Sequence, residues 1–148
     1  MGRNTAITAR PPGGNTFTVV SAITYLPFGP TRALTYGNSL TETRTYDLDY
    51  RLTSIAVNGG GLRLGLTYGY DAANNVKAVT DATNSAMNQA TTYDALDRLT
   101  GATGGFGAPA YTYDNLGNRL ASTVAGAQTV AQYTYDAFGQ RLVKTQPG

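Results

Sequence analysis

The sequence contains no cysteine, no histidine and no tryptophan, and only 14% of its residues are charged. Without cysteine the chain can form neither a disulfide nor a thiolate zinc site. Without histidine it lacks the most common general base and the most common metal ligand. We therefore expect no catalytic residues, no metal site and no cofactor, and we interpret the chain as a protein that is not an enzyme.

Long apolar runs and clusters of charge are also missing. No run approaches the roughly 18 residues of a membrane span, and the N-terminal stretch lacks the apolar core of a signal peptide. The net charge is +2 and the basic residues are scattered singly, so we expect no nucleic-acid partner. We expect residues 1–20 to be a partly disordered lead-in and residues 21–148 to form the folded domain.

Glycine and tyrosine are abundant, with 18 and 11 copies in 148 residues. Together with many threonines, this composition favours strands and turns over helices. The aromatic and β-branched residues are too numerous for a disordered chain. The composition therefore predicts an all-β protein.

Tyr-Asp pairs recur along the chain and indicate an internal repeat. Five clear copies occur, with steps of 24, 23, 20 and 22 residues between the aspartates. Their pairs are Tyr46-Asp47, Tyr70-Asp71, Tyr93-Asp94, Tyr113-Asp114 and Tyr135-Asp136. Four copies continue to an Arg-Leu pair, at Arg51, Arg98, Arg119 and Arg141, whereas the copy at Asp71 has Val76-Lys77. A sixth, degenerate copy lies around Tyr25, with Leu26 in the position of the aspartate.

Each copy has the pattern of a β-hairpin. Alternation places Tyr111 and Tyr113 on one face of a strand, and likewise Tyr133 and Tyr135. Asp at the first turn position and glycine at the fourth (Gly117, Gly139) are typical of a type I turn. The other copies place Asp97, Asn74 and Asp49 at or near the glycine position. The spacing from Asp to Arg is five residues in two copies and four in two others, which predicts a bulge in some copies.

Each repeated residue type has a structural and a functional interpretation. The aspartates could cap their own turns or form a ladder of metal ligands, and one Asp per turn favours caps. The arginines could pair with the Asp or a tyrosine ring, or recognise phosphates or sugars, and their recurrence with the Asp favours pairing. The tyrosines could pack between hairpins or form a platform for carbohydrate, and their position on one strand face favours packing.

The phrase Tyr-Asp-x-x-Gly-x-Arg-Leu, complete in YTYDNLGNRL (111–120) and YTYDAFGQRL (133–142), resembles the pattern of the YD-repeat or Rhs family. That family includes bacterial polymorphic toxins, the C component of insecticidal toxin complexes and animal teneurins, and the resemblance covers residues 21–145. It implies a β-sheet strip that spirals into a hollow shell, which in the toxins encloses a C-terminal toxic domain. The chain has no Asp-Pro-x-x-Gly-type cleavage motif, so we interpret it as a slice of a shell wall.

We therefore expect antiparallel hairpins stacked side by side into a curved sheet strip. The leading functional hypothesis is a structural segment of a shell that encapsulates a toxin or other cargo, in a secreted or surface protein of bacteria. Its partners would be neighbouring YD repeats or the toxin domain of the parent protein. The alternative is an adhesion or glycan-binding module that uses exposed Tyr and Arg rows. Open sheet edges invite pairing, so we also expect a homo-oligomer or a filament.

Overall fold

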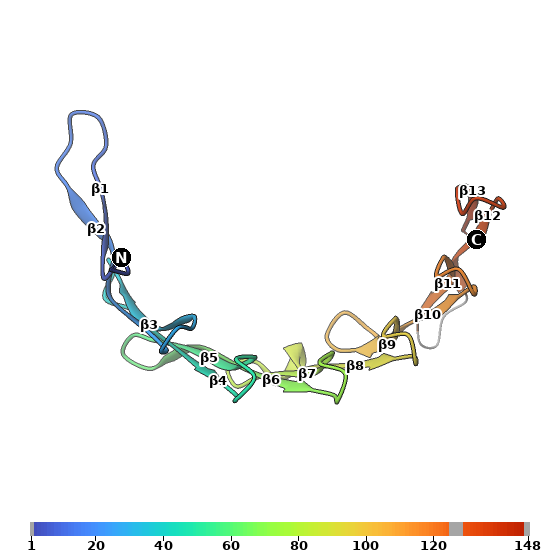
Figure 1. The fold of residues 1–148 in the computed structure, drawn as a ribbon, viewed down its shortest axis with the longest axis horizontal. Helices are drawn as coiled ribbons and strands as arrows, with labels where there is room; N and C mark the ends of the chain where they lie inside the picture. Colours follow the sequence, from blue (N-terminus) through green and yellow to red (C-terminus); the bar gives the residue numbers. More distant parts are fainter. Residues whose placement is uncertain (1, 125–128, 147–148) are drawn as a thin grey trace. The chain divides into compact units, whose positions relative to one another are not determined.

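The computed structural model describes residues 2–124 and 129–146. The strands assigned there form one open sheet in which they follow one another in chain order (Figure 1). They are β1 (Ile7–Ala9), β2 (Phe17–Tyr25), β3 (Thr31–Tyr36), β4 (Thr41–Tyr46), β5 (Leu52–Asn58), β6 (Leu62–Tyr70), β7 (Val76–Asp81), β8 (Gln89–Tyr93), β9 (Leu99–Thr103), β10 (Pro109–Tyr113), β11 (Arg119–Val124), β12 (Thr129–Tyr135) and β13 (Arg141–Thr145). A single 3₁₀ turn, η1 (Ser85–Met87), is the helical element of the described residues. The predicted all-β fold of side-by-side antiparallel hairpins is thus confirmed.

The chain divides into two compact units. The first runs to Tyr68 and includes Thr80–Ser85, and the second contains Gly69–Val79 and the residues from Ala86 onwards. β1 and the first part of β2 fall within residues 1–20, the stretch expected to be a lead-in. No helix in the described part of the chain has the length and apolar character needed to cross a membrane.

The strands show the period of two that their sequences predict. In β10, Tyr111 and Tyr113 are partly covered while Thr112 between them is exposed. In β12, Tyr133 is buried and Thr134 is exposed. Because successive side chains point to opposite faces, the tyrosines share one face and the threonines the other.

Few side chains are buried in this arrangement. Among the residues whose side chains are described, the buried hydrophobic ones are Ile23, Ala131 and Tyr133. A sheet of one layer cannot build a large core, and an isolated two-stranded hairpin is marginal in water. Stability must therefore come from contacts between neighbouring hairpins, as in other repeat proteins.

The pairing within the hairpins follows one rule. We call the aspartate of each copy, or Leu26 in the degenerate copy, the turn residue. The residue directly before the turn residue pairs with the fifth residue after the turn residue. The residue two positions before the turn residue pairs with the seventh residue after it. The pairs are Tyr25 with Thr31 and Thr24 with Ala33, Tyr46 with Leu52 and Thr45 with Ser54, Tyr93 with Leu99 and Thr92 with Gly101, Tyr113 with Arg119 and Thr112 with Ala121, and Tyr135 with Arg141 and Thr134 with Val143. The skipped sixth residue is a β-bulge just after every one of these turns.

The pairing between consecutive hairpins follows a second rule. The seventh residue after one turn residue lies opposite the fourth residue before the next turn aspartate. These pairs are Ala33 with Thr43, Ser54 with Thr67, Ala78 with Ala90, Gly101 with Ala110, and Ala121 with Gln132. The steps between repeats therefore differ because the connections between hairpins, at the margin of the sheet opposite the Tyr-Asp turns, differ in length. The register of the repeated phrase stays constant.

Candidate functional site

The repeated Tyr-Asp turn has the same hydrogen-bond pattern in all five clear copies. The N–H of the aspartate donates to the carbonyl four residues later at 3.0 Å, and the N–H three residues later donates back to its carbonyl at 3.1–3.2 Å. One carboxylate oxygen, Oδ1, accepts the N–H groups two and four residues further on at 2.8–3.0 Å. The structure thus places Asp47, Asp71, Asp94, Asp114 and Asp136 as caps of their own turns.

The bulge predicted for some copies occurs in every copy with a described pairing, so the turns do not differ in length. All five turns close between the aspartate and the fourth residue after it, and the bulge follows in every copy with a described pairing. What differs is the position of the arginine. Arg51 and Arg98 are the last residues of their turns, whereas Arg119 and Arg141 begin the return strand.

The third residue after the aspartate has a left-handed backbone in each copy. Its φ is 61° at Tyr50, 72° at Asn74, 58° at Asp97, 89° at Gly117 and 76° at Gly139. The sequence pointed to Asp49 for the first copy, but the structure puts Tyr50 there. Tyrosine is strained in this region, and its hydroxyl donates to the carbonyl oxygen of Pro27 at 3.0 Å, a contact that holds it in place.

The arginines take two different partners, according to their position. Arg51 and Arg98 donate through Nε to Oδ2 of their own aspartates, Asp47 and Asp94, at 2.6 and 2.7 Å. Where an asparagine ends the turn, its side-chain amide fills the same role, as Asn118 does toward Asp114 at 2.9 Å. The second oxygen of the carboxylate is therefore satisfied from within the turn in these copies.

Arg119 and Arg141, which begin the return strands, lie against tyrosine rings. The guanidinium of Arg119 is 5.5 Å from the ring centroid of Tyr111 and 5.0 Å from that of Tyr133, and its Nη2 donates to the Tyr133 hydroxyl at 3.0 Å. Arg141 lies 5.9 Å from the Tyr133 ring. The two structural partners predicted for the arginines, the turn aspartate and a tyrosine ring, thus both occur in this chain.

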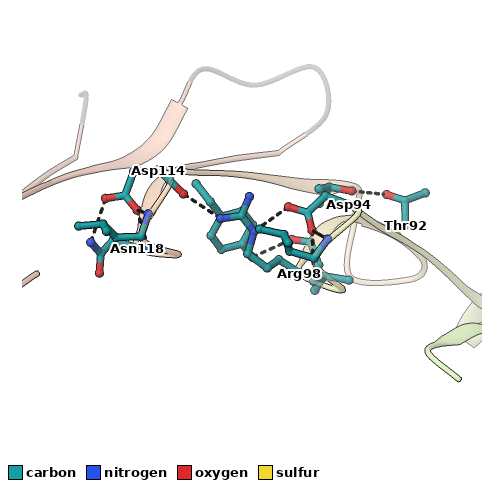
Figure 2. Close-up of polar contacts among 10 residues, drawn as sticks. Thr92, Asp94, Arg98, Asp114 and Asn118 are labelled. Atoms are coloured by element: carbon teal, nitrogen blue, oxygen red, sulfur yellow. Dashed lines mark hydrogen bonds and ion pairs between the residues drawn. The ribbon is translucent and has the colours of Figure 1, made fainter. Parts of the chain in front are cut away.

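Arg98 joins two consecutive hairpins. Figure 2 shows its side chain reaching from the Asp94 turn to the Asp114 turn. Its Nη1 donates to the carbonyl oxygen of Asp114 at 2.8 Å, and its guanidinium lies 4.8 Å from the centroid of the Tyr113 ring. One side chain therefore caps its own turn and fixes the position of the next.

The tyrosine of the Tyr-Asp pair makes a second connection between hairpins. In each of four copies its hydroxyl donates to a backbone carbonyl of the preceding hairpin. This carbonyl belongs to the fifth residue after the turn residue of that hairpin. We call this contact the tyrosine latch. It joins Tyr46 to Thr31 at 2.8 Å, Tyr93 to Val76 at 2.9 Å, Tyr113 to Leu99 at 2.7 Å and Tyr135 to Arg119 at 2.8 Å.

The turn geometry favours the charged form of the aspartates. The pKa of Asp71 lies below its ordinary value mainly because of the Asn75 N–H, and that of Asp114 mainly because of the Asn118 amide. For Asp47 and Asp94, desolvation is the largest single effect and acts to raise the pKa, but the hydrogen bonds from the arginine and from the turn backbone together outweigh it, so the pKa is again lowered. These carboxylates are held as anions that accept hydrogen bonds.

The aspartates are not arranged as metal ligands. Within residues 2–124 and 129–146, no three acidic, histidine or cysteine side chains are grouped so that they could hold a metal ion. In the open groove bordered by Asp71, Asp94 and Asp97, each of these carboxylates already accepts hydrogen bonds, that of Asp97 from the Asn75 side chain at 2.8 Å.

The first unit contains a buried acid, Glu42, that the sequence did not predict. Glu42 is only 3% exposed. Its Oε2 accepts the Tyr36 hydroxyl and its Oε1 accepts Arg44 Nε, both at 2.6 Å. The hydrogen bond to Glu42 is the main reason that the pKa of Tyr36 is raised. Alternation in TETRTY places Glu42, Arg44 and Tyr46 on one face, which was the available signal.

Comparisons with known proteins agree with this geometry. The model of a family described as the teneurin YD-shell matches residues 24–146. No curated protein matches the sequence significantly.

Solved structures with the same fold include subunits of a toxin complex. The crystal structure of TcdB2-TccC3 matches with a TM-score of 0.79 and 19% identity over 88% of this chain. The Tc holotoxin pore of Photorhabdus luminescens matches with a TM-score of 0.77 and 20% identity over 88% of this chain. TcdB2-TccC3 without its hypervariable C-terminal region matches with a TM-score of 0.77 and 20% identity over 90% of this chain. The chain corresponds to 8% of the length of each of these neighbours.

Proposed function

Because the chain belongs to the teneurin YD-shell family, we propose that it is a segment of the wall of a shell that encloses a C-terminal toxin or other polypeptide cargo. Its function is enclosure and it catalyses no reaction. The parent protein is secreted or exposed on the surface of a bacterial cell. Its partners are the neighbouring YD repeats and the enclosed domain.

The observation that carries this proposal is the constant connection between hairpins. Each junction with a described pairing has the same register, and a tyrosine latch is described for Tyr46, Tyr93, Tyr113 and Tyr135. A unit that joins its neighbours in one fixed way can extend a sheet for any number of copies. Such a sheet is suited to a wall, because it covers area without needing a core of its own.

Exposed apolar residues at the turns support the same function. In the second unit, Leu96, Leu116 and Phe138 stand at the third position of their turns and are 68%, 76% and 89% exposed. Large apolar side chains that recur on one margin of a sheet are available for contact with other parts of a larger assembly. The neighbours of similar fold also belong to a toxin complex, and TcdB2-TccC3 has a hypervariable C-terminal region.

The test is protection of the C-terminal segment in the full-length protein. We expect that limited proteolysis leaves this segment intact, since the shell excludes the protease. The double variant Tyr113→Phe/Tyr135→Phe, which removes two latches, should make cleavage faster, whereas Tyr111→Phe should not. A C-terminal segment that is cut at the rate of an isolated, unfolded peptide would contradict enclosure.

Glycan binding by the Tyr and Arg rows is the second candidate. It requires tyrosine ring faces that are open to a sugar, but Arg98 lies over Tyr113 and Arg119 lies over Tyr111. These contacts favour packing over sugar recognition. Binding on a glycan array that disappears in the Tyr111→Ala/Tyr113→Ala variant, with the fold retained, would establish this alternative.

A further inference from the structure

A tyrosine ring and the backbone carbonyl of the residue after it hold a guanidinium at two places in the chain. The guanidinium of Arg98 lies 4.8 Å from the centroid of the Tyr113 ring, and its Nη1 donates to the carbonyl of the following turn residue at 2.8 Å. The guanidinium of Arg3 lies 4.6 Å from the centroid of the Tyr25 ring, and its Nη1 donates to the carbonyl of Leu26 at 3.4 Å. We call such a ring and carbonyl a guanidinium socket.

The junction between the Asp71 and Asp94 turns has the same socket without an arginine. Its ring belongs to Tyr93 and its carbonyl to Asp94. The last residue of the preceding turn is Asn75, whose shorter side chain donates to the carboxylate of Asp97 at 2.8 Å. Among the described residues, no cation lies over the Tyr93 ring and no side chain donates to the Asp94 carbonyl.

An open groove with a volume of about 490 Å³ lies at this junction and includes the socket. Three alanines of the two turns, Ala72, Ala73 and Ala95, supply its apolar lining. Ala73 stands at the turn position that Leu116 and Phe138 occupy in later copies, so a small side chain leaves room here. Alanine methyl groups suit the methylene stem of a long basic side chain.

The charges of the groove favour a cation. Asp94 is already paired with Arg98, whose Nε donates to it at 2.7 Å. The remaining charged groups of the lining are the carboxylates of Asp71 and Asp97 and the single ammonium of Lys77. Oδ1 of Asp97 accepts one hydrogen bond, and its Oδ2 accepts none within the described part of the chain. A guanidinium has five donors in a planar fork and stacks on aromatic rings, so it matches a ring, a carbonyl and a carboxylate together.

We propose that this groove binds an arginine side chain of another polypeptide, with its guanidinium over the Tyr93 ring and donating to the Asp94 carbonyl and the Asp97 carboxylate. The bound arginine takes the place that Arg98 takes at the next junction, and its stem contacts the alanine methyl groups. The inference does not depend on what the parent protein encloses, because the groove is built from residues of two consecutive turns.

Binding is tested by amide NMR spectra of the whole chain during titration with the peptide acetyl-Gly-Arg-Gly-amide. We expect the peptide to shift the signals of the two turns that border the groove, 71–75 and 94–98, and to leave those of the turn 114–118 in place. The same peptide with citrulline, a neutral isostere of arginine, should bind about tenfold more weakly, because it lacks the charge. The lysine peptide should bind about threefold more weakly, because an ammonium has no planar fork.

Variants of the chain locate the site. Asn75→Arg supplies a guanidinium from the chain itself, as Arg98 does at the next junction, and should weaken peptide binding about tenfold. Its matched control is Asn118→Arg, at the same position of a turn that does not border the groove, which should leave binding unchanged. Asp97→Asn removes the charge but keeps a residue that tolerates the left-handed backbone, and should weaken binding about threefold to tenfold.

Several results would overturn the inference. These are an arginine peptide that shifts no signal of the two turns, a citrulline peptide that binds equally tightly, and a folded Asn75→Arg chain that binds the peptide as the unaltered chain does. Equal affinity for the lysine peptide would mark a general cation site and contradict the assignment to arginine. If Asn75→Arg does not fold, Asp97→Asn decides, and unchanged binding by that variant contradicts the proposal.

Discussion

At the scale of single residues, one carboxylate oxygen organises each turn. Oδ1 of Asp114 accepts two backbone N–H groups that would otherwise have only water as a partner. We expect Asp114→Ala to lower the free energy of unfolding, because both turn N–H groups lose their side-chain acceptor. Urea unfolding followed by circular dichroism measures it. The matched control is Asn115→Ala, at the next and exposed position of the same turn, and an equal loss in the two variants would disprove the capping role.

The same carboxylates make stability depend on pH. The pKa of Asp47, Asp71, Asp94 and Asp114 is lowered in the folded protein. A lowered pKa contributes stability that is present above the unfolded value of about 3.9 and is lost as the pH falls through the folded value. We therefore expect stability to be steady near neutral pH and to fall below about pH 4.

An acid titration followed by circular dichroism measures this dependence. Asp114→Asn retains an acceptor oxygen but cannot be protonated in this range. The variant should therefore lose less free energy of unfolding between pH 5 and pH 2 than the wild type, and the difference is the contribution of Asp114. An unchanged acid transition would mean that the turn carboxylates do not contribute to it.

At the scale of elements, the hairpins are held together by contacts that cross from one to the next. The hydroxyls of Tyr111 and Tyr113 provide a matched comparison on one strand. That of Tyr113 donates to the carbonyl of Leu99, whereas that of Tyr111 has no hydrogen bond among the described residues. We expect Tyr113→Phe to lower the free energy of unfolding by about 0.5–1.5 kcal/mol and Tyr111→Phe to change it little.

Hydrogen exchange would locate the effect of Tyr113→Phe. Exchange should become faster in β9 and β10, which the latch joins, and stay unchanged in the first unit. If Tyr111→Phe and Tyr113→Phe cost the same, the latch makes no specific contribution and packing of the rings explains the tyrosines.

At the scale of the whole molecule, the strands form one sheet with little core. The side chains of β13 are all exposed, and few hydrophobic side chains are buried among the described residues. We expect the isolated chain to self-associate weakly through its edges. Sedimentation velocity at increasing concentration measures this self-association. A monomer at every concentration would contradict the prediction.

The sequence by itself determined the family, the all-β class and the positions of the turns. These depend on residues that are close together in the chain, because an aspartate caps N–H groups two and four residues away and glycine or asparagine supplies the left-handed backbone. A turn that is determined by residues close together in the chain can be recognised from the sequence. The repetition of that pattern then made the side-by-side sheet predictable.

Only the tertiary structure decided how the hairpins are joined. The latches connect residues 14 to 17 apart, and the unequal steps between repeats hide their common register. The structure also showed that Arg51 and Arg98 bind their own aspartates, whereas Arg119 and Arg141 begin the return strand and lie on tyrosine rings, although all four precede a leucine. Arg98 makes both kinds of contact, since it also lies on the Tyr113 ring. Because every turn has the same length and is followed by the same bulge, an arginine four residues after the aspartate reaches the carboxylate, whereas one five residues after it faces the neighbouring strand. The spacing in the sequence showed only that the two positions differ.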